Sequence, residues 1–92
     1  ILIDCLTLFV SNLMLKGLKE GTIIKEVNNL LVTLNKTKAK AIIVSNEVGL
    51  GIVPNTKLGR SFRDVAGKIN QAVARKSDEV FFMVSGIPWR IK

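Results

Sequence analysis

The residues best suited to chemistry lie at the ends of two apolar segments, one at the start of the chain and one near its middle. Asp4 lies near the end of residues 1–5, and Asn46 and Glu47 follow soon after Ile42–Val44. Both segments are rich in branched aliphatic side chains, which predicts buried strands. Parallel strands end at one edge of a sheet, where ligands bind, so the two carboxylates can face one crevice. An acid in such a position often holds Mg²⁺ beside a phosphate group.

Each of these two acids also has an ordinary structural interpretation. Asp4 can cap the helix expected to begin at Leu6, which is common for an aspartate at a strand end. Glu47 can be a turn residue, because it lies between Asn46 and a pair of glycines. Spacing alone leaves both roles open for Asp4. At Glu47, three polar residues in a row after a strongly apolar strand favour a site.

The stretch after the second strand, residues 45–54, reads SNEVGLGIVP and contains Gly49 and Gly51. A buried strand that runs into a polar loop with several glycines is typical of the way an open α/β sheet presents a binding site. The loop lacks the Gly-Lys-Ser/Thr ending of a phosphate-binding loop and also the GxGxxG pattern. We therefore expect a loop at a binding site that does not itself cradle phosphate.

A strip of small and polar residues follows the expected helix Lys57–Lys76, beside its apolar stripe. The strip consists of Gly59, Arg63, Gly67, Asn70 and Ala74. A glycine inside a helix costs about 1 kcal/mol relative to alanine. The strip is therefore interpreted as a surface that another backbone, a subunit or a ligand approaches closely, with tight packing onto the chain's own sheet as the alternative. Arg60 and Asp64, four residues apart, are expected to form a weak ion pair on the solvent side.

The composition limits the chemistry further. The chain has no histidine, which removes His-based metal sites and His general bases from it. Its single cysteine, Cys5, excludes an internal disulfide and fits a reducing, cytoplasmic setting. The apolar neighbours of Cys5 favour a buried small side chain over a reactive thiol.

Ninety-two residues make one small domain, and a hydrophobic content of 48% with 23% charged residues indicates a packed core. The net charge is +7, which suggests an anionic partner as one possibility. However, the lysines are scattered and the few aromatic residues do not alternate with them, so we expect no nucleic-acid binding. No apolar run has the roughly 18–20 residues of a membrane span. The chain has no initiator Met and begins inside an expected strand, so we expect it to be a piece of a longer protein.

Periodicity predicts the elements that position these residues. They are a strand over 1–5, a helix over 6–15, a flexible connection over 16–21, a helix over 22–35, a strand over 41–44, a helix over 57–76, a buried strand over 80–85 broken by 86–88, and a short edge piece over 89–92. The order β, α, α, β, loop, α, β predicts an α/β fold with a parallel sheet and right-handed crossovers. These helices alone cannot cover both faces of a three-stranded sheet, so we expect the rest of the sheet to lie outside this chain.

Three segments of the chain together resemble the second half of the bifunctional adenosylcobinamide kinase/adenosylcobinamide-phosphate guanylyltransferase family. These segments are LIDCLTLFVSNLM, IIVSNEVGLGIVPNTKLGRSFRDVAGKINQAVA and DEVFFMVSGIPWRIK. The most specific parts are the SNEVG-G-IVP loop and the FRD-x-AG-x-x-NQ helix, in this order and at this spacing. The resemblance covers essentially the whole chain and is weakest over residues 16–40.

The resemblance implies a P-loop, RecA-like, three-layer α/β fold, of which residues 1–92 form the C-terminal part of a single nucleotide-binding domain. It also implies an oligomeric enzyme of cobalamin biosynthesis that uses GTP, ATP and Mg²⁺. Such an enzyme phosphorylates adenosylcobinamide and then transfers GMP from GTP to that phosphate through a guanylyl-histidine. The family's phosphate loop and histidine lie in its first half, so we expect no catalytic residue in this chain and no activity from the chain alone.

The resemblance also assigns roles to particular residues. Asp4 matches an acidic strand-end residue near the nucleotide, which adds nucleotide binding to its possible magnesium role. The signature loop, expected to shape the active-site crevice or a subunit contact, is matched by Asn46, Glu47, Gly49 and Gly51. Possible interface or substrate contacts are Arg63, Gly67 and Asn70. The alternative from a different class is a small basic α/β binding module for an anionic partner. A phosphate loop and a histidine encoded upstream would favour the enzyme.

Overall fold

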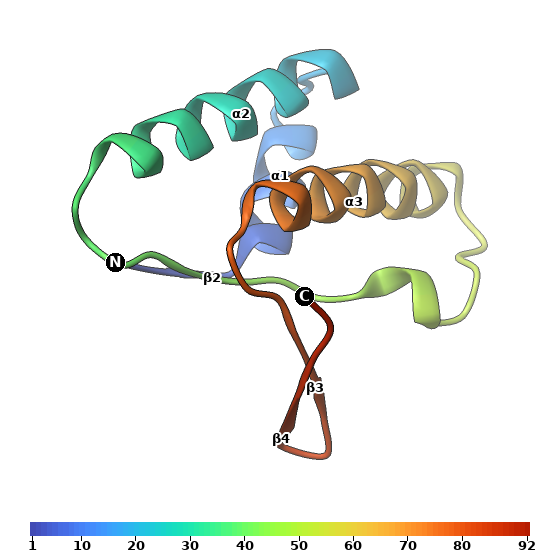
Figure 1. Ribbon diagram of the computed structural model, residues 1–92. Helices are drawn as coiled ribbons and strands as arrows, with labels where there is room; N and C mark the ends of the chain where they lie inside the picture. Colours follow the sequence, from blue (N-terminus) through green and yellow to red (C-terminus); the bar gives the residue numbers. More distant parts are fainter.

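The computed structural model describes residues 1–92 and contains three α-helices, one short 3₁₀ helix and four strands (Figure 1). In chain order they are β1 (Leu2–Asp4), α1 (Leu6–Leu15), α2 (Glu20–Lys36), β2 (Ile42–Val44), η1 (Val48–Leu50), α3 (Lys57–Lys76), β3 (Phe81–Val84) and β4 (Ile87–Arg90). The predicted helices are all present. The second begins two residues earlier than periodicity predicts, so the connection before it is short. The fold is therefore mixed α/β, as predicted.

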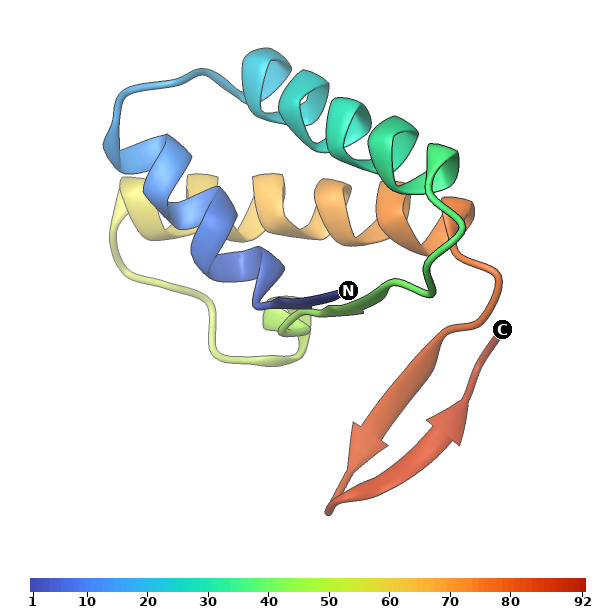
Figure 2. The same cartoon turned by 90° about the vertical axis from the view of Figure 1, so that its left-hand side faces the viewer.

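β1 and β2 form a two-stranded parallel sheet, in which Leu2 pairs with Ile42 and Asp4 with Val44. The connection between them runs through α1 and α2, so the predicted parallel unit is confirmed. All three helices lie on the same side of this sheet, as both views show (Figure 2). The other face is bare, and Leu2 is 66% exposed and Ile42 56%. The prediction of buried strands is wrong for these residues because no second layer covers that face.

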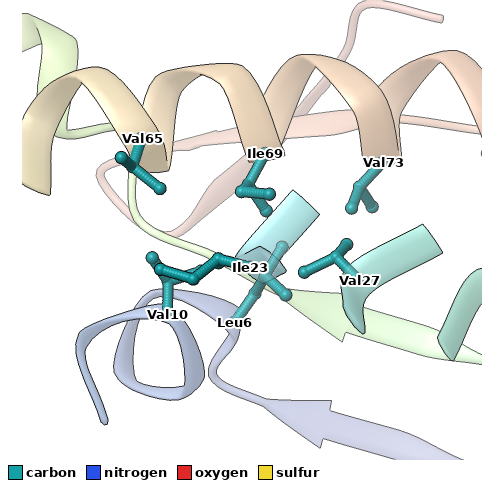
Figure 3. Packing of buried hydrophobic residues seen from close by; sticks show 7 residues of the cluster. All are labelled: Leu6, Val10, Ile23, Val27, Val65, Ile69 and Val73. Carbon is teal, nitrogen blue, oxygen red and sulfur yellow. The ribbon is translucent and has the colours of Figure 1, made fainter. Parts of the chain in front are cut away.

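The core lies between the three helices. Figure 3 shows its side chains pointing toward one another: Leu6 and Val10 from α1, Ile23 and Val27 from α2, and Val65, Ile69 and Val73 from α3. Within each helix these residues recur four apart, so they lie on one face. Burying each such side chain contributes roughly 1.5–3 kcal/mol. Leu58, in the first turn of α3, is 60% exposed because that turn extends past the core.

The end of the chain departs most from the sequence-based expectation. Residues 80–85 were expected to form a further parallel strand ending at a break over 86–88. Instead β3 and β4 form a separate antiparallel hairpin, with Phe81 opposite Arg90. Ser85 and Gly86 both have positive φ angles, 51° and 74°. This is the backbone of a two-residue turn whose twist matches that of a hairpin. Pairing with the adjacent strand therefore replaces pairing with β2.

The hairpin extends away from the helices, and its base is fastened to the end of α3 (Figure 2). Lys92 Nζ donates to the carbonyl oxygens of Ala74, Arg75 and Ser77, at 3.0, 3.1 and 2.6 Å. The Ala74 carbonyl also accepts the Ser77 N–H at 3.3 Å, whereas the Arg75 and Ser77 carbonyls have no backbone donor. A cation is favourable at this negative end of the helix dipole. None of the helices has the length and apolar character needed to cross a membrane.

Candidate functional site

The predicted loop is attached to both α1 and α3 where it leaves β2. Asn46 Nδ2 donates to Thr7 Oγ1 at 2.9 Å, and Asn70 Nδ2 donates to the carbonyl oxygen of Asn46 at 2.9 Å. Ser45 Oγ donates to Asn70 Oδ1 at 2.6 Å. The two residues that follow β2 are thus held by the Thr7 hydroxyl group of α1 and by the Asn70 amide group of α3.

The rest of the loop runs along α3 toward its first turn (Figure 1). Two arginines of α3 hold it there. An Arg63 guanidinium nitrogen donates to the carbonyl oxygen of Gly49. Arg60 donates to the carbonyl oxygens of Pro54 and Asn55, at 3.2 and 3.0 Å. Arg60 is therefore engaged with the loop, and the ion pair expected with Asp64 is not formed.

The two carboxylates predicted for the site lie at the same edge of the sheet. Asp4 is the last residue of β1 and is opposite Val44, three residues before Glu47. Asp4 is exposed and does not cap α1, because the N-cap position is Cys5 and no side chain caps this helix. Glu47 accepts the Gly49 backbone N–H at 3.3 Å and caps η1. Of the two, only Asp4 has no hydrogen-bonding partner of its own.

The chain alone does not form a closed metal site. It contains no group of three or more acidic, cysteine or histidine side chains that could hold an ion. Magnesium at nucleotide sites usually takes one or two carboxylates together with phosphate oxygens and water. A single exposed Asp4 at the strand end fits that donor set, whereas it does not fit a cage made only of protein ligands.

The strip on α3 contacts the chain's own loop at three of its positions. Arg63 and Asn70 are two helical turns apart and bind the loop backbone. At Gly59, an added Cβ would lie 2.8 Å from Pro54 Cβ and 2.8 Å from Thr56 Oγ1. Gly67 is different, because an added Cβ would meet nothing within 4 Å. The chain therefore provides a close neighbour for Gly59 but none for Gly67.

Thr7 belongs to this network, although the sequence analysis did not select it. It is 5% exposed, and its Oγ1 accepts from Asn46 and lies 3.2 Å from Cys5 Sγ. A buried hydroxyl group is costly unless it forms hydrogen bonds. A threonine among apolar residues at the start of a helix was the available signal. What it could not indicate was the partner, which lies 39 residues away.

An open groove lies between the end of α1 and the start of α3, with a volume of about 280 Å³. Its lining includes Met14, Leu15, Leu58 and Phe62 and no titratable side chain. Of the residues that the sequence analysis selected, only Gly59 lines it. The polar chemistry of this chain is therefore located at the carboxyl edge of the β1/β2 sheet and along the loop.

A parallel β-α-β unit with carboxylates and a braced polar loop at its strand ends defines an α/β protein of the class that binds ligands at that edge. The chain belongs to the cobinamide kinase/cobinamide phosphate guanyltransferase family, whose model matches residues 1–91. This confirms the resemblance found in the sequence.

Three curated relatives match over the whole chain. The bifunctional adenosylcobalamin biosynthesis proteins CobU of Salmonella typhimurium and Escherichia coli K12 are each 39% identical to it over 104 residues. The corresponding protein CobP of Pseudomonas aeruginosa is 40% identical over 92 residues. The match covers 58% of each of the first two proteins and 53% of the third. The chain thus spans a little more than half the length of these relatives.

Proposed function

We propose that this chain is the C-terminal part of an enzyme that phosphorylates adenosylcobinamide with ATP or GTP and then transfers GMP from GTP to the new phosphate. The family match over residues 1–91 carries the proposal. The three relatives are named as bifunctional adenosylcobalamin biosynthesis proteins, which fits two activities in one chain. The match also favours the enzyme over a basic binding module.

In this proposal the full-length protein has a P-loop, RecA-like, three-layer fold, and residues 1–92 belong to its single nucleotide-binding domain. The phosphate loop and the guanylylated histidine lie in the region that precedes this chain. The bare apolar face of the β1/β2 sheet is consistent with a larger sheet and a further layer. The single cysteine fits activity in the cytoplasm.

Asp4 is the residue of this chain proposed to act at the nucleotide. It is exposed at the carboxyl edge of β1, and no side chain of this chain forms a hydrogen bond or ion pair with it. When Mg²⁺ is bound with a nucleoside triphosphate, it neutralises charge on the phosphates. Asp4 would hold and orient that ion, directly or through water.

The loop is proposed to form one wall of the crevice. Asn46, Glu47, Gly49 and Gly51 lie in a segment whose carbonyl groups are held by α3, so the wall keeps its shape when substrate enters. The side chains of Arg63 and Asn70 are occupied by these bonds and serve to hold the wall. Gly67 is proposed to face a neighbouring subunit of a homo-oligomer, because its own chain leaves that space free.

The test is an assay of the full-length protein with two labels. GTP labelled at the γ-phosphate follows phosphorylation of adenosylcobinamide, and GTP labelled at the α-phosphate follows GMP transfer to adenosylcobinamide phosphate. We expect both labels to reach the corrinoid product in a manner that requires Mg²⁺. A purified full-length protein that transfers neither label would contradict the proposal.

A further inference from the structure

Asn46 is held at two points by two different helices. Its side chain donates to Thr7 at the start of α1, and its backbone carbonyl accepts from Asn70 in the middle of α3. Asn70 in turn accepts from Ser45, so its amide bonds two consecutive residues at the carboxyl end of β2. A loop residue bonded through both its side chain and its backbone has little freedom to change conformation.

Thr7 is the only buried polar residue of the chain, and packing alone does not require its hydroxyl group. Valine has nearly the same shape and carries no polar atom, so it would fill the same place beside Leu6 without a desolvation cost. The hydroxyl group bonds the amide of Asn46, which is exposed and could bond water instead. The Thr7–Asn46 bond therefore adds little to the stability of the core and mainly fixes the loop.

The position of Asn46 determines where the next residues lie. Glu47 follows directly, its carboxylate accepts the Gly49 N–H, and the Gly49 carbonyl is held by Arg63. The chain from Ser45 to Gly49 is thus braced at both ends, with Glu47 between the two braces. Displacing one end would shift the wall that faces the crevice.

We propose that Thr7 and Asn70 are positioning residues that hold the Asn46–Glu47 turn in the conformation required for catalysis. This rests on the proposed function. Small displacements of positioning groups cost rates of order 10²-fold even when the mutated residue lies away from the chemistry. The effect should appear mainly in kcat, because the substrates can still bind while the crevice is misaligned.

The test compares Thr7→Val, Thr7→Ser and Asn70→Asp in the full-length protein, with Thr33→Val as the matched control. Thr33 is an exposed residue of α2 whose hydroxyl group bonds only Asn29 within the same helix. We expect Thr7→Val and Asn70→Asp to lower kcat about 10- to 100-fold with little change in KM. Thr7→Ser keeps the hydroxyl group and should recover most of the rate, and Thr33→Val should behave as the unchanged protein.

A second readout does not depend on activity. A protease that cleaves after glutamate reports how often the loop opens, because cleavage requires local unfolding. We expect cleavage after Glu47 to be faster in Thr7→Val than in Thr7→Ser or the unchanged protein, while cleavage after Glu26 in α2 stays the same. Mass spectrometry of the fragments distinguishes the two sites.

Three results would overturn the proposal. The first is an unchanged kcat in Thr7→Val, even if its melting temperature falls, because that pattern indicates a purely structural role. The second is a Thr7→Ser variant as impaired as Thr7→Val. The third is equal cleavage after Glu47 in all variants, including no cleavage in any of them. If the unchanged protein transfers no label to cobinamide, the proposed function fails, and the cleavage comparison still decides whether Thr7 fixes the loop.

Discussion

Replacing Gly67 by alanine separates the two explanations for the glycine in the middle of α3. An added Cβ at this position meets no atom of its own chain within 4 Å. The methyl group therefore makes no contact within the chain, and the substitution changes stability only through helix propensity. Alanine is favoured over glycine by about 1 kcal/mol in a helix interior. Without a neighbouring subunit, Gly67→Ala should raise the free energy of unfolding by about that amount.

A subunit packed against this face would make the substitution destabilising instead of stabilising. Forcing a methyl group into a filled contact typically costs about 1–3 kcal/mol. Because the structure excludes a clash within residues 1–92, any destabilisation must come from a contact outside them, and a contact with a second subunit would also lower the mass of the oligomer. We therefore expect Gly67→Ala in the full-length protein to weaken the oligomer. A lower mass by analytical ultracentrifugation at micromolar concentration, with the helical circular dichroism signal retained, is the expected observation.

Gly59→Ala is the matched control on the same helix. Its Cβ would lie 2.8 Å from atoms of Pro54 and of Thr56, the N-cap residue of α3. This variant should lower the melting temperature through a clash inside its own chain, whether or not an oligomer forms. If Gly67→Ala instead raises the melting temperature and leaves the mass unchanged, Gly67 faces solvent and the interface assignment is refuted.

Three further predictions concern the chain's ends and surface. The 92-residue chain alone should transfer no label from GTP, because it has no phosphate loop and no histidine; measurable transfer by the purified chain would refute this. Lys92→Met should lower the free energy of unfolding by about 0.5–1 kcal/mol in thermal melts, since it removes a cation from the end of α3; no change would mean that water replaces it. A hydrogen bond and ion pair with Glu20 hold the pKa of Lys68 above its ordinary value of 10.5. Because folding raises this pKa, the interaction with Glu20 stabilises the fold fully at a pH below the ordinary pKa of lysine. This stabilisation is lost as the pH rises above the raised pKa. Lys68→Met should therefore melt slightly lower at pH 8 in low salt, and this difference should vanish in strong alkali; a difference that persists there would contradict the ion-pair origin.

The helices could be predicted because their residues interact mainly with near neighbours in the sequence. The β1/β2 pairing joins residues 40 apart, such as Leu2 and Ile42, and it was predicted from the order of the elements. Apolar residues four apart predict Ile23 with Val27 and Val65 with Ile69 on one helix face each. Strong strand formers followed by polar residues predict the end of β2. Such local patterns do not depend on which segment packs where.

The hairpin was missed because residues 86–88, Gly-Ile-Pro, were interpreted as a break after the strand. Ser85–Gly86 between two apolar runs is a hairpin signal, and a proline is tolerated in an edge strand. β4 has a neighbour on one side only, so Pro88 fits there.

The bracing of the loop could not be predicted, because it depends on long-range partners. The Thr7–Asn46 bond joins residues 39 apart, and the Asn46–Asn70 bond joins residues 24 apart. The sequence marked Arg63 and Asn70 as unusual side chains on one helix face. It could not show that both bond the loop of their own chain.

The most direct test of the central claim is label transfer by the full-length protein carrying Asp4→Asn, with Asp78→Asn as the control. Asp78 is an exposed aspartate between α3 and the hairpin, and it forms no ion pair. Losing a charge that holds the metal and its phosphates typically costs a few kcal/mol of transition-state stabilisation, or roughly 10²–10³ in rate. We predict that Asp4→Asn loses Mg²⁺-dependent transfer by this factor with its fold intact, while Asp78→Asn remains active. Near-normal turnover by Asp4→Asn would contradict the assignment of the β1/β2 edge as the nucleotide site.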